Sequence, residues 1–327
     1  MKIDVHAHVY PAAYLDMLDR FGGTETGTAI ARNLHADQTP EDLERRVAMM
    51  DRAGVDLQIL SVSPQAPYFS NQDQAGEAAR FVNDIYAKIV DQGHGRFAAF
   101  ASLPLPHVGA AIAEMKRSLD ELSMVGVTVT TSILGKPFAD SGLDELFVEL
   151  DRREAVVFIH PSGLGLSSSM VTRANLTWPI GAPFEDTLCV LQLMQARIPE
   201  RFPRIKFISS HLGGCLSFLI KRIDVQAPSF MPGLALPGAT ARLFWFDTVN
   251  AHPSALRCAC ETYGSDRLLL GTDTPYWQDG LYQLAVDYIA QSGLSAQDVE
   301  RIRAENAFSL FGARLSQVVD RMKKSVA

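Results

Sequence analysis

Eight short apolar runs, each followed by a longer segment with helical periodicity, constrain the fold of this chain more than any other feature. Runs of this kind are typical of parallel strands that are joined by crossover helices. Several runs are apolar at nearly every position, as expected for strands buried on both faces. The pattern predicts an α/β fold, a (β/α)8 TIM barrel, whose strands cover residues 3–8, 57–62, 97–103, 126–131, 156–160, 205–211, 243–247 and 268–273.

The intervening segments predict helices, the first of which begins at Pro40 after an N-cap at Thr39. The chain shows no internal repeat and no low-complexity linker, so we expect one metal-dependent barrel domain over residues 1–327. We expect helices at residues 40–53, 74–92, 109–122, 143–152, 183–196, 214–226, 253–263 and 281–291, with a last one at 295–311 on the outside.

Two stretches exceed what a minimal barrel needs. Residues 9–38 follow the first strand and residues 163–182 follow the fifth, and both are rich in Gly, Ser, Thr and Pro. Loops at the carboxyl ends of the strands build the active sites of this architecture. We therefore expect these two inserted loops to form the roof of a pocket.

Polar residues with metal-binding chemistry end four of the predicted strands. His6 and His8 are two residues apart, a spacing that projects both side chains to the same face of a strand. His160 ends the fifth predicted strand, His211 the sixth and Asp273 the eighth. Because carboxyl ends of barrel strands meet at one mouth, we expect a metal site formed by His6, His8, His160 and Asp273.

The composition of this set indicates one ion with an open coordination position. Three imidazoles and a carboxylate suit Zn²⁺, the metal we favour, with Mn²⁺ or Fe²⁺ as alternatives. Binuclear sites in metal-dependent barrels of this kind usually have a bridging carboxylated lysine at the end of strand four, but residues 126–131 contain none and Lys136 lies beyond them. His211 is then left as a base or electrostatic stabiliser, and Asp273 can also carry protons.

Net charge and composition exclude several other classes of protein. A formal charge of −7 leaves no basic stripe, so we expect no nucleic-acid partner. No apolar tract is long enough for a membrane span, and the N-terminus lacks the features of a signal peptide. The four cysteines are too few for a disulfide framework and predict buried thiols. We expect a cytoplasmic protein.

Four segments around these residues resemble the amidohydrolase-2 group of the amidohydrolase superfamily, and the resemblance extends over nearly the whole chain. The group includes α-amino-β-carboxymuconate-ε-semialdehyde decarboxylase and related hydroxybenzoate decarboxylases. This chain has His6 where the γ-resorcylate enzymes carry a glutamate, and Leu212 where the muconate enzyme has a glycine. The segments are IDVHAH (residues 3–8), FIHP (158–161), SHLGG (210–214) and LGTDTP (270–275), supported by MDRAGVD (50–56) and WPIGAPFE (178–185).

The resemblance implies a metal-dependent carboxy-lyase that acts on a small unsaturated or aromatic carboxylic acid. His211 and Asp273 would be catalytic, because loss of CO₂ leaves electron density on carbon that must be stabilised and then protonated. It also implies a homodimer or homotetramer, in which Arg222 reaches the neighbouring subunit's site. The predicted substrate-binding residues are Arg46, Trp178, Phe184, Arg222 and Tyr276.

The sequence also allows purely structural roles for three of these residues. Trp178 could close a hydrophobic cap, Arg46 could belong to a solvated helix face, and Arg222 could be structural. The same ion and base could also hydrolyse an ester, lactone or amide, or hydrate a dienoic acid. A metal-binding barrel without catalysis would lack a base such as His211.

Overall fold

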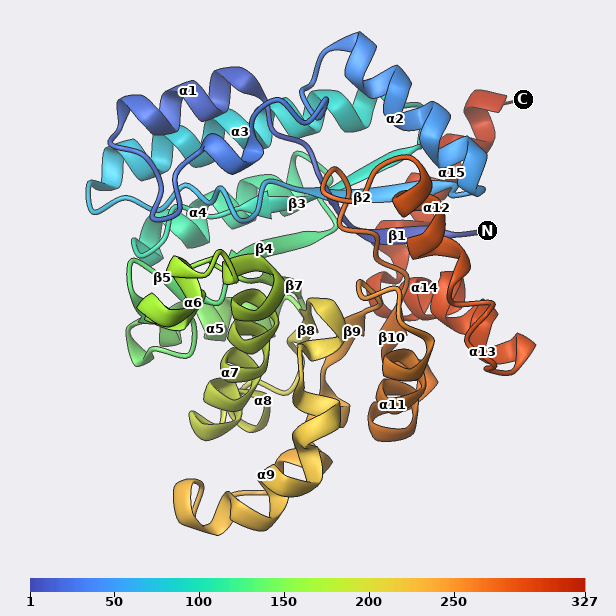
Figure 1. Cartoon of the computed structure of the whole chain (residues 1–327). Coiled ribbons are helices and arrows are strands. Elements are labelled where there is room, and N and C mark those ends of the chain that lie inside the picture. Colours follow the sequence, from blue (N-terminus) through green and yellow to red (C-terminus); the bar gives the residue numbers. More distant parts are fainter. Residues whose placement is uncertain (327) are drawn as a thin grey trace.

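The computed structural model describes residues 1–326, and Ala327, the last residue of the predicted domain, lies outside them. Eight strands pair in parallel in chain order (Figure 1), and the segment that follows the last strand bridges back to the first. Ala7 bridges Thr274, and the N–H of His8 donates to the carbonyl oxygen of Thr274 at 2.7 Å. The predicted barrel is confirmed, with strands β1 (Ile3–His8), β2 (Leu57–Ser61), β3 (Phe97–Ser102), β4 (Gly126–Thr130), β7 (Val156–His160), β8 (Lys206–Ser209), β9 (Trp245–Asp247) and β10 (Leu268–Leu269).

Helices follow the strands and surround the barrel. Thr39 caps the first crossover helix by accepting from the N–H of Asp42 at 3.3 Å, and Gly54 ends it with a left-handed φ of 65°. Two predicted helices have the expected bounds, and the others differ by a few residues at their ends. The crossover helices are α2 (Pro40–Ala53), α3 (Gln72–Gln92), α4 (Val108–Asp120), α5 (Asp144–Arg152), α7 (Ala182–Gln195), α9 (Leu216–Phe230), α11 (Pro253–Tyr263) and α12 (Gly280–Asp287).

The inserted segments contain more regular structure than their composition predicts. Residues 9–38 form helix α1 (Ala12–Arg20), which buries Tyr14, Leu15 and Leu18. Pro11 precedes this helix without a side-chain cap, so the usual start signal is absent. The remaining additions are α6 (Ser169–Arg173), a π-helical turn (Thr177–Gly181), the hairpin β5 (Ser132–Ile133) and β6 (Lys136–Pro137), and the short helices α8 (Ile198–Arg201) and α10 (Pro237–Thr240).

The predicted last helix, residues 295–311, is interrupted. It consists of α13 (Ala296–Glu300), a π-helical turn (Arg301–Glu305) and α14 (Asn306–Phe311). A further helix, α15 (Ala313–Val326), follows Gly312, whose φ of 56° changes the chain direction. Buried side chains of α14 and α15 belong to the same hydrophobic cluster as Phe100 and Phe158, so these helices cover one end of the barrel.

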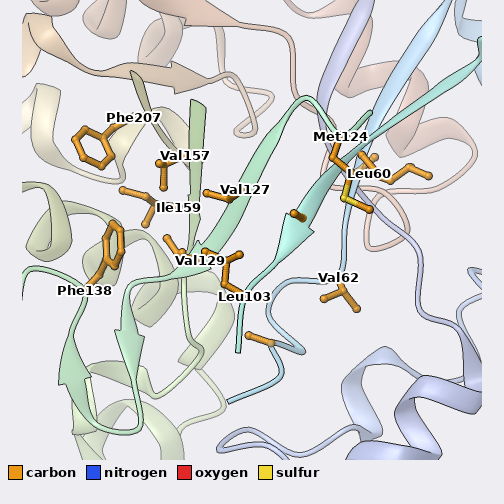
Figure 2. Close-up of a cluster of buried hydrophobic side chains, with 14 of the residues drawn as sticks. Leu60, Val62, Leu103, Met124, Val127, Val129, Phe138, Val157, Ile159 and Phe207 are labelled. Atoms are coloured by element: carbon orange, nitrogen blue, oxygen red, sulfur yellow. The ribbon is translucent and has the colours of Figure 1, made fainter. Parts of the chain in front are cut away.

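Two hydrophobic layers place the site at the other end. Along β7, Val156 and Phe158 alternate with Val157 and Ile159, so the two pairs face opposite sides of the strand. Val156 and Phe158 lie on the side of His160, within the barrel, whereas Val157 and Ile159 pack outward toward Phe138 and Phe207 (Figure 2). The ligand residues of β1 and β7 thus lie at the end of the barrel opposite to these helices.

Within residues 1–326, no helix combines the length and the apolar character that crossing a bilayer would require.

Candidate metal centre

Four side chains from three parts of the barrel converge at its mouth. His6 and His8 come from β1, His160 ends β7, and Asp273 follows β10. One ligand atom from each residue can be chosen so that all four lie within 4.8 Å of one another. The three imidazoles are buried and the Asp273 side chain is 15% exposed, so the site opens on the side of the carboxylate.

The shortest distances within this group indicate where a cation would lie. The Nε2 atoms of His6 and His8 are 3.1 Å apart, and the Oδ1 atom of Asp273 is 3.3 Å from the first and 3.2 Å from the second. Lone pairs of several neutral imidazoles that face one another repel unless a positive charge lies between them. The donor set of three nitrogens and one oxygen therefore fits one divalent ion.

Each of the three rings has a partner on its far side, and two of these partners fix the tautomer of the ring. The Nδ1–H of His6 donates to Oδ2 of Asp247 at 2.7 Å, and that of His160 donates to the carbonyl oxygen of Pro161 at 2.9 Å. Nδ1 of His8 lies 3.0 Å from the hydroxyl of Ser61. Because acceptors hold the Nδ1 protons of His6 and His160, the Nε2 lone pairs of these two rings point into the site, as ligation requires.

Burial and charge set the protonation of the ligands. Burial lowers the pKa of His8 to about 4, and it lowers the pKa of His160 well below its usual value. Burial acts in the same direction on His6, but the Asp247 carboxylate outweighs it and raises the pKa to about 9. Burial would raise the pKa of Asp273, yet hydrogen bonds from the surrounding imidazoles hold it well below its usual value.

His211 lies beside the four ligands on a tight turn after β8. Its backbone N–H donates to Oδ1 of Asp247 at 3.0 Å, and its Nδ1–H donates to Oδ2 of the buried Asp186 at 2.8 Å. Its Nε2 faces the site, 3.9 Å from Oδ2 of Asp273. Burial opposes the charged imidazole, but the carboxylates of Asp186 and Asp273 hold the pKa of His211 well above its usual value.

Close backbone approach makes this turn specific to glycine. Gly214 has a φ of 66°, and a Cβ atom there would lie 1.7 Å from the carbonyl oxygen of Pro183 at the start of α7. The turn that carries His211 is thereby pressed against the helix that carries Asp186. This contact brings His211 and Asp186, which are 25 residues apart in the sequence, close enough to form a hydrogen-bonded pair, the catalytic dyad.

Glu185 fixes the loop that follows His160. Its Oε2 accepts from the N–H and the hydroxyl of Ser162, both at 2.8 Å, and from the N–H of Gly163 at 3.1 Å. Its Oε1 accepts from the N–H of Gly165 at 2.9 Å. A buried carboxylate with this many donors holds the end of β7 and the start of the second inserted loop in one conformation.

A cavity of about 680 Å³ extends from the ligands toward solvent. Its wall is mostly apolar, and none of its lining residues is a lysine or an arginine. The first inserted loop, the second inserted loop and the segment after β10 each contribute to it. Besides His160, His211 and Asp273, the cavity is lined by Ile30, Leu34, Trp178, Pro179, Ala182, Pro183, Val249, Asn250, Tyr276 and Trp277.

The predicted substrate-binding residues divide into two groups. Trp178 and Tyr276 line the cavity, whereas Arg46, Phe184 and Arg222 do not. Arg46 is buried on α2 and donates to the carbonyl oxygen of His8 and to the side-chain oxygen of Gln58. Through these bonds, Arg46 supports the end of β1 on the side facing away from the cavity. Phe184 is partly exposed on α7, and Arg222 is exposed on α9.

Sequence reasoning assigned no role to Asp186 or Asp247. Asp247 ends the predicted seventh strand, so its position at the carboxyl edge was a usable signal. Asp186 lies within a helix, where nothing local marks it, and only the tertiary contact with His211 reveals it. Trp277 and Asn250 of the cavity wall were also missed, because loop conformation decides their direction.

Comparisons with known proteins identify the family of the chain. The amidohydrolase family model matches residues 3–313. A 6-methylsalicylic acid decarboxylase from Penicillium expansum is 30% identical over an alignment 337 positions long, which covers 98% of this chain and 99% of that protein. A 2-amino-3-carboxymuconate-6-semialdehyde decarboxylase from Dictyostelium discoideum is 26% identical over 299 residues, which cover 84% of this chain and 82% of that protein.

A solved structure shares the fold. The dihydroxybenzoic acid decarboxylase from Polaromonas, determined with bound manganese and the inhibitor 2-nitroresorcinol, matches with a TM-score of 0.80 at 24% identity. The match covers 95% of this chain and 96% of that chain.

Proposed function

Because the chain belongs to the amidohydrolase family, we propose that it is a metal-dependent, non-oxidative decarboxylase of a small hydroxylated aromatic or unsaturated carboxylic acid. The observation that carries the proposal is the placement of the His211–Asp186 pair beside a four-residue ligand set, at the floor of an apolar cavity. The relatives that match nearly the full chain are named as decarboxylases of such acids, which supports the same reaction.

We propose His6, His8, His160 and Asp273 as the ligands of one divalent ion, Zn²⁺ first and Mn²⁺ as the alternative. When bound, the ion would supply Lewis-acid chemistry at the substrate, by withdrawing electron density from an oxygen that it binds or by activating water. Manganese in the related dihydroxybenzoic acid decarboxylase supports the alternative. Metal analysis of the purified protein, expressed without supplementation, distinguishes the two.

The residues of the chain supply orientation and a proton. The cavity wall holds a flat ring between Trp178 and Tyr276 and excludes water from the floor. Cleavage of the bond to the carboxylate releases CO₂ and leaves the electron pair on the ring carbon, which then needs one proton. His211, kept protonated by Asp186, holds that proton at Nε2 and exchanges it with the neighbouring Asp273.

We also propose that the protein is a homodimer or homotetramer, with α9 in the interface. This helix projects from the barrel in Figure 1, and its side chains Phe218 and Val225 are 82% and 69% exposed. Apolar surface of this kind marks association sites. Arg222 lies on the same helix, and in an assembly it would bring to a neighbouring cavity the positive charge that its own wall lacks. Light scattering of Phe218→Glu against the parent protein tests the interface.

The activity is tested by CO₂ release over a panel of hydroxybenzoates and carboxymuconate semialdehydes, measured together with metal content. We expect CO₂ evolution that requires about one ion per chain. His211→Ala should retain the ion and lose most turnover, because His211 is not in the ligand set. Cleavage of esters or lactones without any CO₂ would reject the decarboxylase in favour of a hydrolase.

A further inference from the structure

Two tyrosines share a hydrogen bond at the edge of the cavity. Tyr276 lines the cavity, whereas Tyr10 is buried behind it. Their hydroxyl oxygens are 3.1 Å apart. The Tyr10 hydroxyl also lies 2.9 Å from the backbone carbonyl oxygen of Ser63, with the geometry of a donor.

The two tyrosine hydroxyls have one hydrogen each and the carbonyl of Ser63 has none, and this determines the direction of both hydrogen bonds. A carbonyl oxygen only accepts, so the single hydroxyl hydrogen of Tyr10 goes to Ser63. The contact between the two phenols then requires the hydrogen of Tyr276, which is donated to the oxygen of Tyr10. The hydroxyl of Tyr276 therefore offers the cavity only the lone pairs of its oxygen.

This acceptor stands out among the polar groups of the wall. Trp178 and Trp277 also line the cavity, and an indole N–H only donates. Asn250 carries both a donor and an acceptor, but it is exposed. A substrate group that hydrogen-bonds to the Tyr276 oxygen must therefore be a hydrogen-bond donor.

We propose that Tyr276 is a specificity-determining residue that accepts a hydrogen bond from a ring hydroxyl of the substrate, and that Tyr10 positions it for this task. The inference rests on the proposed function and narrows it. The ring hydroxyl that Tyr276 would bind is a second one. The first hydroxyl lies beside the carboxylate, and both of these groups would face the floor of the cavity. Preferred substrates are hydroxybenzoic acids with a second hydroxyl, and the methyl ether of that hydroxyl is bound less well.

The test uses salicylates with a second hydroxyl at each free ring position, each paired with its methyl ether. Dissociation constants are measured by calorimetry on the metal-loaded protein, and CO₂ release is followed on the same set. At one ring position, the parent protein should bind the hydroxyl compound about five- to tenfold more tightly than its ether, as one neutral hydrogen bond allows. Tyr276→Phe should remove this preference.

Tyr10→Phe provides the decisive comparison, because it leaves Tyr276 in place and frees its hydrogen. The ether can then accept from Tyr276, so the ratio of the two dissociation constants should fall toward one. Tyr14→Phe is the matched control: Tyr14 is equally buried and donates to the carbonyl oxygen of Gln65 at 2.7 Å, but it does not line the cavity. Its ratio should equal that of the parent protein.

The outcomes separate this inference from the function on which it rests. CO₂ release with equal affinity for every hydroxyl and ether pair would overturn the role of Tyr276 alone. A preference that survives in Tyr10→Phe would overturn the role of Tyr10. A hydroxyl preference without CO₂ release from any acid of this panel or of the wider panel above would reject the decarboxylase and keep the binding role. A protein that binds none of the salicylates would overturn the inference, and CO₂ release from the carboxymuconate semialdehydes would then still decide the decarboxylase.

Discussion

Replacement of Asp186 by asparagine tests the catalytic dyad directly. The carboxylate accepts from the Nδ1–H of His211 at 2.8 Å, and within residues 1–326 its other oxygen, Oδ1, is buried without a hydrogen-bond partner. The amide oxygen of asparagine can still accept from Nδ1–H, so the shape of the site is kept and only the charge is lost. A hydrogen bond to a charged group contributes about 1.5–3 kcal/mol, which corresponds to a fall in kcat of about 13- to 160-fold.

The assay is steady-state CO₂ release by Asp186→Asn, with metal content measured on the same sample. Asp186 is outside the ligand set, so the ion should be retained while kcat falls. A pH profile adds a second criterion. The carboxylate holds the pKa of His211 high, so its loss should move the alkaline limb of kcat to lower pH. An unchanged kcat, or a loss of metal in place of a loss of turnover, would refute the assignment.

Three further predictions concern the ion and the turn that carries His211. Asp247→Asn should weaken metal affinity about 10- to 100-fold in a competition titration with a chelator, because Asp247 orients the ring of His6, and equal affinity would contradict this. Since the pKa of His6 is raised to about 9, a metal ion that binds at neutral pH must displace a proton from this imidazole. Metal affinity should therefore rise about tenfold per pH unit between about pH 6 and 8, and an affinity that does not change with pH would reject His6 as a ligand. Gly214→Ala, which sets a Cβ atom 1.7 Å from the carbonyl oxygen of Pro183, should lower the free energy of unfolding by at least about 3 kcal/mol in a urea titration. Gly76→Ala, a control on α3 with nothing within 4 Å, should raise it by about 1 kcal/mol, and similar values for the two variants would refute the steric argument.

The ligand set could be predicted because its geometry is mostly local. His6 and His8 share a strand, and His160 ends another, so the period of the strand and the parallel order of the barrel determine where these side chains meet. Strand β10 is shorter than its predicted range, because the chain leaves the sheet before Asp273, whose φ is 60°. That departure did not affect the prediction, since Asp273 still lies at the mouth.

The cavity wall could not be predicted equally well, because tertiary contacts decide which way its residues point. Phe184 was expected at the substrate, but it lies on α7 outside the cavity lining, while Pro183 beside it lines the cavity. Arg46 lies on a helix whose bounds were predicted correctly, yet its side chain is buried against the back of β1. Helical periodicity gives the face of a helix but not the loop or strand that covers it.

The distribution of formal charge explains how such a site selects and orients an acid. Asp186 is balanced by protonated His211 at the floor, and the charges of Asp247 and Asp273 would be balanced by the proposed divalent ion. Without the ion, the floor would repel a carboxylate; with it, the floor is neutral overall and places a concentrated positive charge at one point. The wall above contributes no lysine or arginine. Within one subunit, the counter-charge for an incoming acid would therefore lie at the floor, which would direct the carboxylate there and leave the ring between the apolar walls.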